Sequence, residues 1–83
     1  MTIRVLLFGH YKDAAPPGGA LTLDDLPGGA SVADAAARLG ALDARLSDLL
    51  ARARVAVNAD FADANTLLSD SDEIAFLPPM SGG

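Results

Sequence analysis

Hydrophobic and polar positions alternate most clearly at the start of the chain. Residues 2–8 are rich in branched side chains, and a period of two over this run predicts a strand with two different faces. One face is wholly apolar and consists of Ile3, Val5 and Leu7. The other face consists of Arg4, Leu6 and Phe8. Because Arg4 is charged, we expect this second face to lie toward solvent.

The clearest helical pattern begins at Ser31. Serine is a favoured N-cap, and Asp34 three residues later approximates a capping box. Side chains at helical spacing then form one apolar face, made of Val32, Ala35, Ala36 and Leu39. Gly40 is placed to end the helix. Leucines at helical spacing indicate a second helical stretch that packs into the core, namely Leu42, Leu46, Leu49 and Leu50. The charged residues between them are expected to be solvated, namely Asp43, Arg45, Asp48 and Arg52.

Further short apolar segments predict the remaining strands, at residues 20–24, 55–58, around Phe61 and at 73–77. Turn residues separate them at 27–29, 58–60 and 69–72. Residues 9–19 form a loop with room for one helical turn around Lys12 and Asp13. The order strand, strand, helix, strand, short strand, strand is typical of an α+β fold in which one sheet face packs on the main helix.

The opposite face of the predicted sheet carries large apolar side chains. Glu73 marks the solvent side of the last strand, which places Leu77 on that side as well. Phe8 lies on the solvent side of the first strand, and Phe61 follows a turn from which it can join them. We expect these three residues to form a protein-docking patch.

Composition excludes several kinds of function. A net charge of −5 argues against nucleic acid as a partner. The chain has no cysteine, and His10 is its one histidine, so thiolate metal sites and thiol nucleophiles are excluded and a histidine relay is disfavoured. No glycine-rich segment has the lysine and helix context of a phosphate-binding loop. With no membrane-length apolar run and no secretory signal, we expect a cytoplasmic protein that binds neither metal nor membrane.

The final six residues, Pro78-Pro79-Met80-Ser81-Gly82-Gly83, form the most informative motif. The two prolines favour an extended backbone, and the two glycines leave the terminal carboxylate without neighbouring side chains. Six extended residues reach about 20 Å. We therefore predict a domain over residues 1–77 and an extended, flexible tail over residues 78–83 that can enter an active site on another protein.

The segment from Ala75 to Gly83, with the turn acids Asp70, Asp72 and Glu73 before it, resembles the C-terminus of the small subunit of molybdopterin synthase, the MoaD family of ubiquitin-like sulfur carriers. Residues 5–8, 31–32 and 55–58 resemble this family more loosely. The resemblance implies a ubiquitin-like β-grasp fold, with a mixed sheet packed on one main helix. Lys12 replaces the arginine that is more usual in relatives, and no role is carried over to it or to residues 13–19.

The resemblance also implies a mechanism. In the family an E1-like activating enzyme uses ATP to adenylate the terminal carboxylate, here that of Gly83, and a sulfur donor protein then displaces AMP to leave a thiocarboxylate. The tail enters the large catalytic subunit of a heterotetrameric synthase and delivers sulfur to cyclic pyranopterin monophosphate in molybdenum cofactor biosynthesis. The chain would bind no cofactor and would not be catalytic alone. By this resemblance Gly82 and Gly83 carry the chemistry, and the partner-binding residues are Phe8, Phe61, Leu77, Pro78, Pro79, Met80 and Ser81.

Three alternatives remain open from the sequence. A sulfur carrier for thiazole synthesis shares the Gly-Gly end and the activation chemistry, although such carriers usually lack the Phe-x-Pro-Pro approach to the tail. A ubiquitin-like modifier would instead join Gly83 to lysines of other proteins. A β-grasp binding module with an inert tail would tolerate deletion of Gly82 and Gly83.

Overall fold

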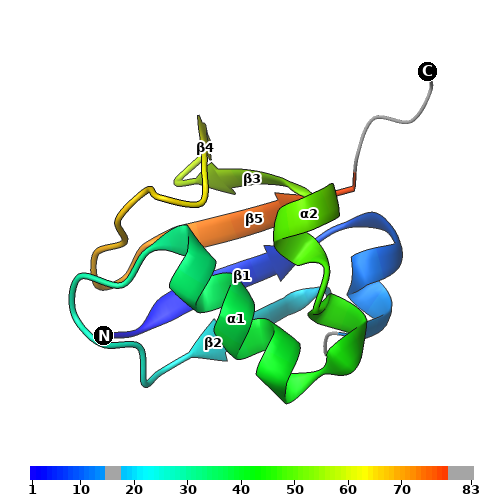
Figure 1. Ribbon diagram of the computed structural model, residues 1–83, viewed down its shortest axis with the longest axis horizontal. Coiled ribbons are helices and arrows are strands. Elements are labelled where there is room, and N and C mark those ends of the chain that lie inside the picture. Colours follow the sequence, from blue (N-terminus) through cyan, green and yellow to red (C-terminus); the bar gives the residue numbers. More distant parts are fainter. Residues whose placement is uncertain (15–17, 79–83) are drawn as a thin grey trace.

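A five-stranded mixed sheet and one main helix form two packed layers (Figure 1). The computed structural model describes residues 1–14 and 18–78. The strands are β1 (Ile3–Leu7), β2 (Ala20–Leu23), β3 (Arg54–Val57), β4 (Asp60–Ala62) and β5 (Glu73–Leu77). The helices are α1 (Val32–Leu42), α2 (Leu49–Arg52) and the 3-10 segments η1 (Gly9–Ala14) and η2 (Ala44–Leu46). None of the helices in these described ranges is long and apolar enough to cross a membrane.

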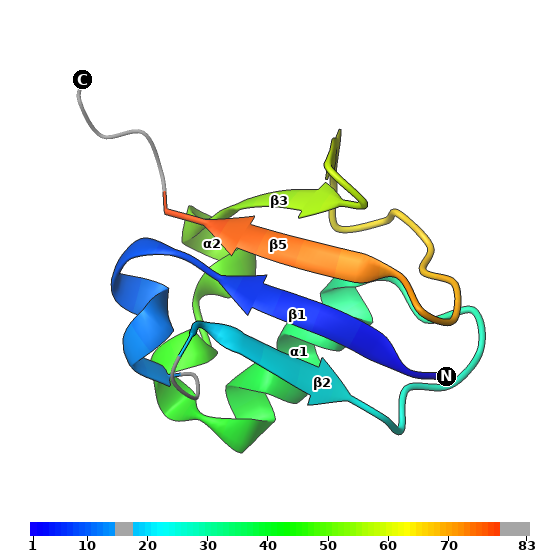
Figure 2. The same ribbon diagram turned by 180° about the vertical axis from the view of Figure 1, so that it is seen from behind.

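The strand order β2-β1-β5-β3-β4 places β5, the last strand in the sequence, in the middle of the sheet. β5 runs parallel to β1 and antiparallel to β3, and the outer strands β2 and β4 pair antiparallel with their neighbours. The helices cover one side of the sheet, and Figure 2 shows the side that they leave uncovered. The predicted strands and the order of the elements along the sequence are confirmed, and the predicted helical turn in the loop is the 3-10 segment η1.

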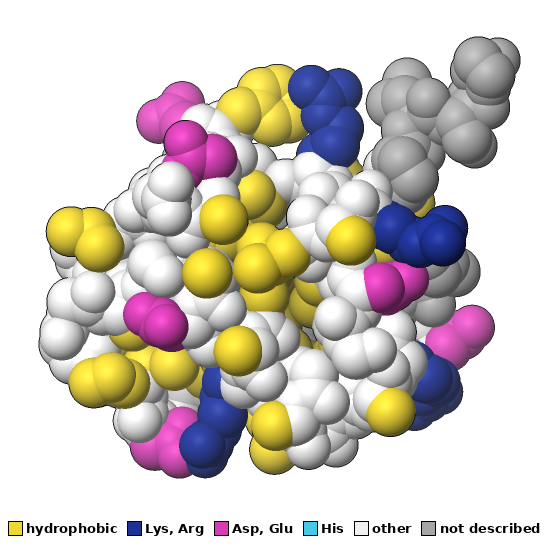
Figure 3. All heavy atoms as spheres, in the orientation of Figure 1, with side chains coloured by type: hydrophobic (Ala, Val, Ile, Leu, Met, Phe, Trp, Pro, Cys, Tyr) yellow, Lys and Arg dark blue, Asp and Glu magenta, His cyan; other side chains and the backbone are white. Residues whose placement is uncertain are grey.

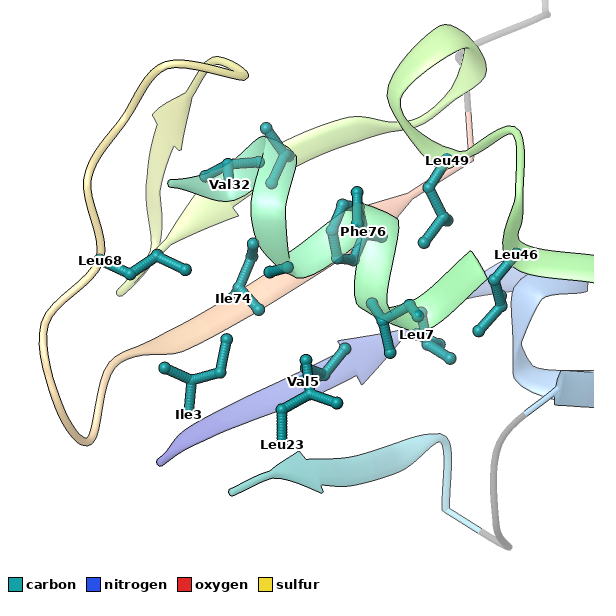
Figure 4. Packing of buried hydrophobic residues seen from close by; sticks show 14 of the residues in the cluster. Ile3, Val5, Leu7, Leu23, Val32, Leu46, Leu49, Leu68, Ile74 and Phe76 are labelled. Carbon is teal, nitrogen blue, oxygen red and sulfur yellow. The ribbon is translucent and has the colours of Figure 1, made fainter. Parts of the chain in front are cut away.

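The core lies between α1 and the covered side of the sheet, as the alternation of apolar residues predicted. Ile3, Val5 and Leu7 of β1 are at most 2% exposed, while Arg4 is exposed. The sheet residues meet the predicted apolar face of α1, whose four members are all buried. Figure 4 shows Ile74 and Phe76 of β5 beneath α1, with Leu46 and Leu49 closing one end. Both β5 residues are 0% exposed, and the other three residues of this central strand are half-buried.

The end of α1 differs from the prediction. The helix continues past Gly40 to Leu42, where the backbone N–H of Asp43 donates to Leu39 O over 3.0 Å. Gly40 instead allows a close approach of the following segment, since a Cβ at this position would lie 3.2 Å from Ser47 Cα. Gly40 therefore does not end the helix, and its lack of a side chain instead lets the following segment pack closely against α1.

The predicted second helical stretch divides into η2 and α2, and this changes which leucines are buried. Leu46 and Leu49 lie in the core, as predicted, but Leu42 is 62% and Leu50 45% exposed. A single helix would have kept all four on one face, whereas Leu42 ends α1, and breaks at residue 43 and at residues 47–48 place Leu46 and Leu50 on two further segments. The intervening charged residues form the exposed ion pairs Arg45–Asp43 and Arg52–Asp48.

Asn58 holds the β3–β4 turn against the turn that precedes β5. Asn58 and Ala59 have φ angles of 51° and 73°, the left-handed pair that a two-residue hairpin turn of the primed type requires. The Asn58 side chain donates to Asp72 Oδ1 over 2.9 Å and accepts from the backbone N–H of Glu73 over 3.0 Å. The predicted turn is thus confirmed, and its asparagine also fixes where β5 begins.

Candidate functional site

The uncovered side of the sheet, here called the open face, is apolar across its middle. The strand register aligns Leu6, Ala75, Ala56 and Phe61 in one row across β1, β5, β3 and β4. One end of the face is polar, because Arg4 and Glu73 are register partners and form an ion pair at 3.5 Å. The other end lies where β5 leaves the sheet. In this row the two small alanines lie between the larger side chains of Leu6 and Phe61, so the middle of the face is lower than its sides.

The three residues predicted to form a docking patch all lie on this open face. Phe8 continues the alternation of β1, with its N–H donating to Phe76 O, and is 40% exposed. Phe61 is 74% exposed, whereas the next residue in β4, Ala62, lies on the other face of the strand and packs against the core. Leu77 ends β5 and is half-buried. The predicted placement is confirmed, and their role in binding a partner stays a prediction.

A groove adjoins the point where β5 ends. It has a volume of about 240 Å³ and is lined by Arg54, Phe61, Leu77 and Pro78. Arg54 is the register partner of Leu77, and its guanidinium carbon lies 4.7 Å from the centroid of the Phe61 ring. The groove is thus closed on one side by a cation stacked on an aromatic ring, a contact that the sequence analysis missed. The sequence contains no local pattern for this contact, because the contact depends on the register that brings β3 beside both β4 and β5.

Gly9 fixes the direction in which the chain leaves β5. It follows Phe8 with a φ of +60°, and a Cβ added to it would lie 2.6 Å from Pro78 Cγ. The Pro78 ring therefore packs against bare backbone at Gly9, which only a glycine provides without displacement. Of the predicted tail residues, Pro78 is described in this position, half-buried beside Leu77. Pro79, Met80, Ser81, Gly82 and Gly83 lie outside the described residues.

A second hollow lies on the helix side, where hydrophobic side chains gather in Figure 3. It has a volume of about 360 Å³ and lies between α2, β3 and β4, with Leu50, Ala53 and Ala62 among its lining residues. Its lining combines apolar side chains with Arg54 and Asp63, without a nucleophile or a histidine. The described part of the chain also contains no group of histidine, cysteine or acidic side chains that could hold a metal ion.

Ionisable groups with shifted pKa values lie away from the open face and have structural causes. The Arg45 guanidinium and backbone N–H donate to Asp43, and these hydrogen bonds lower the pKa of that carboxyl. Burial raises the pKa of the Tyr11 phenol, which lies in the core. Neither group faces the groove or the root of the tail. The features of the open face that the structure describes are its exposed apolar side chains and the groove beside the root of the tail.

Comparisons with known proteins agree with this geometry. The sequence model of the ThiS family matches residues 5–83. The molybdopterin synthase sulfur carrier subunit of Mycobacterium tuberculosis is 32% identical over 81 residues, which are 98% of this chain and 96% of that protein. Small archaeal modifier protein 1 of Methanosarcina acetivorans has a TM-score of 0.80 at 27% identity, covering 99% of this chain and 96% of that one.

A complex offers a further structural match. Within the complex of subunits 1 and 2 of the molybdopterin-converting factor from Helicobacter pylori, the matched chain has a TM-score of 0.69 at 26% identity, with both chains covered completely. These matches confirm the predicted ubiquitin-like β-grasp fold and the resemblance to molybdopterin synthase sulfur carriers.

Proposed function

Because the chain belongs to the ThiS family, we propose that it is the sulfur carrier subunit of molybdopterin synthase. The observation that carries this proposal is the 32% identity to a subunit of that name across 98% of the chain. The structure supports it independently, since β5 leaves the sheet beside an exposed apolar face and its sequence continues from Pro78 to Gly82-Gly83.

The proposed chemistry takes place at the Gly83 carboxylate. A carboxylate is a poor electrophile because its leaving group would be oxide. An E1-like enzyme joins this carboxylate to AMP, with release of pyrophosphate from ATP, and so provides a good leaving group. Hydrosulfide supplied by a donor protein then attacks the acyl carbon, and AMP departs with the bonding electron pair. The product is a thiocarboxylate, whose sulfur bonds to a carbon of cyclic pyranopterin monophosphate, after which water cleaves the acyl carbon–sulfur bond and restores the Gly83 carboxylate.

The proposed partner of the open face is the large catalytic subunit of the synthase. The Helicobacter pylori match is a chain in a complex of subunits 1 and 2, which supports a two-subunit assembly for this protein as well. Phe8 and Phe61 are exposed in the isolated chain, and their burial in such a complex would remove apolar surface from water. Pro78 packed against Gly9 would direct the tail from this interface into the partner, at a low cost in conformational entropy.

The experiment is intact-mass spectrometry after incubation with ATP, the cognate activating enzyme and a sulfur source, followed by a thiol alkylator. Replacing oxygen by sulfur is nearly isobaric with methionine oxidation, so the alkylated adduct is the diagnostic product. Because the chain has no cysteine, we expect one adduct, which fragmentation places at Gly83. The ΔGly83 variant is the matched control and should remain unlabelled. Absence of the adduct, with a known carrier labelled alongside, would contradict the proposal.

A second candidate, a protein modifier, is favoured by the 27% identity to small archaeal modifier protein 1. This function would join Gly83 to a lysine of a target protein through an isopeptide bond. Arg54 is the last basic residue, so trypsin would leave residues 55–83 attached to the target lysine as a branched peptide. Such peptides from cells would establish conjugation. Sulfur delivery to the pterin in a purified synthase would distinguish the molybdopterin role from a thiazole role.

A further inference from the structure

Arg54 differs from the other arginines in its electrostatic partner. Among the described residues, the remaining arginines each pair with a carboxylate, in Arg4–Glu73, Arg38–Asp25, Arg45–Asp43 and Arg52–Asp48. Arg54 makes no ion pair with a described carboxylate, and its recorded contact is the ring of Phe61 at 4.7 Å. At the upper edge of Figure 3, basic and hydrophobic side chains adjoin where β3 and β4 lie. Arg54 is the register partner of Leu77 and so belongs to the open face, where it is a cation without a carboxylate partner among the described residues.

Stacking on Phe61 prepares Arg54 to bind an anion. A guanidinium that lies over a ring keeps its N–H edge available, so it can form two parallel hydrogen bonds to a carboxylate while still stacked. The ring also restricts a side chain that would otherwise lose much rotamer freedom on binding. Leu77 and Pro78 complete the groove of about 240 Å³ beside it. The groove and the cation together fit an apolar side chain next to a carboxylate.

Charge elsewhere on the chain makes this cation distinctive. The protein has a net charge of −5, so an acidic partner gains nothing from overall attraction and must place its carboxylate locally. The other arginine on the open face, Arg4, is already neutralised by Glu73. Among the described arginines of the open-face strands, Arg54 is therefore the one left without a carboxylate, and it lies beside the root of the tail.

We infer that Arg54 is a specificity residue of the open face, pairing with an aspartate or glutamate of the large synthase subunit whose neighbouring apolar side chain fills the groove. This inference rests on the proposed function, because that function supplies the partner. The pair would fix the orientation of the partner next to Pro78, where the tail begins. Correct orientation at this point decides whether the tail is directed into the partner's active site.

The test measures binding of the full chain to the purified large subunit by calorimetry at several salt concentrations. Arg54→Met keeps the length and stacking of the side chain but removes its charge, and we expect at least a tenfold weaker affinity with a smaller salt dependence. Arg54→Lys should recover part of the affinity and the salt dependence. Arg38→Met changes net charge equally on α1, away from the open face, and should bind within about twofold of wild type. Unchanged thermal melting of each variant establishes that the fold is intact.

Each outcome separates the inference from the proposed function. A wild-type chain that does not bind the large subunit overturns the proposed function and this inference together. A wild-type complex that tolerates Arg54→Met, or loses equal affinity with Arg38→Met, overturns the inference alone. An affinity loss with unchanged salt dependence and no recovery in Arg54→Lys also overturns it, because Arg54 would then only support Phe61.

Discussion

Substituting Gly9 by alanine should destabilise the protein through two separable effects. The first is conformational, because a φ of +60° is unfavourable for any residue with a Cβ. The second is steric, because the new Cβ would lie 2.6 Å from Pro78 Cγ and within 3.3 Å of two more ring atoms. Carbon atoms pack best at roughly 3.5 Å or more, so the proline ring must move by about 0.9 Å.

The two effects have estimable sizes. Left-handed backbone costs an alanine about 1–2 kcal/mol, offset by roughly 0.4–1 kcal/mol because alanine restricts the unfolded chain. Forcing an extra methyl group against a packed ring typically costs about 1–3 kcal/mol more. Gly29 provides the matched control, since its φ is +84° and a Cβ there would meet nothing within 4 Å. Gly29→Ala should therefore show the conformational cost alone.

Urea denaturation of both variants measures the steric cost as the difference between their free energies of unfolding. We expect Gly9→Ala to lose about 1–3 kcal/mol more than Gly29→Ala. Adding Pro78→Ala should remove most of that difference, because the clashing ring atoms are then absent. Equal losses in the two glycine variants would refute the conclusion that Gly9 seats the proline. If the tail delivers sulfur as proposed, Gly9→Ala should also slow that transfer at temperatures where it remains folded.

Two further predictions concern α1 and its surroundings. Ser31→Ala removes the hydroxyl that accepts from Asp34 N–H over 3.3 Å, and thermal unfolding should show a loss of about 1 kcal/mol, or roughly 4–8 °C; Asp34→Ala should add little to it, and additive losses would contradict a reciprocal capping box. Hydrogen bonds from Arg45 lower the pKa of Asp43 from its ordinary value of 3.8, so the carboxylate stabilises the fold above about pH 4 and this contribution disappears as pH falls through the lowered pKa. Asp43→Asn should thus be less stable than wild type at pH 7, with the gap narrowing below about pH 4. A gap independent of pH would contradict this cause, and so would a gap that is undiminished in an Arg45→Gln background, which keeps only the backbone N–H donor.

Local rules predicted the strands and the start of the main helix because their causes lie within a few residues. The alternation in residues 2–8 needs only the pleat of a strand, and the Ser31–Asp34 capping box needs only one turn of helix. Placement of Phe8 and Leu77 on the open face followed in the same way from the charges at Arg4 and Glu73. These predictions use no information about which strands are neighbours.

The errors and omissions arise where distant segments meet. Gly40 looked like a helix terminator, but its lack of a side chain serves the approach of Ser47. The contact of Gly9 with Pro78 joins residues at opposite ends of the sequence, and the stacking of Arg54 on Phe61 depends on a hairpin register. Periodicity in one segment contains no information about such contacts. Both unpredicted contacts lie beside the root of the tail. The sequence therefore indicated the residues of the site but not the contacts that position them.

The position of β5 explains how a chain end can act on another protein while its root stays fixed. The strand pairs with β1 over residues 73–76 and with β3 over residues 74–77, and Phe76 near its end is fully buried. Removing residues after Pro78 would take away no strand pairing and no core side chain among the described residues, whereas removing Phe76 would open the core beneath α1. A large aromatic removed from a core costs about 3–5 kcal/mol, a substantial share of the stability of a small domain. Core stability therefore depends on Phe76, whereas the proposed chemistry takes place at Gly83, beyond the end of the same strand.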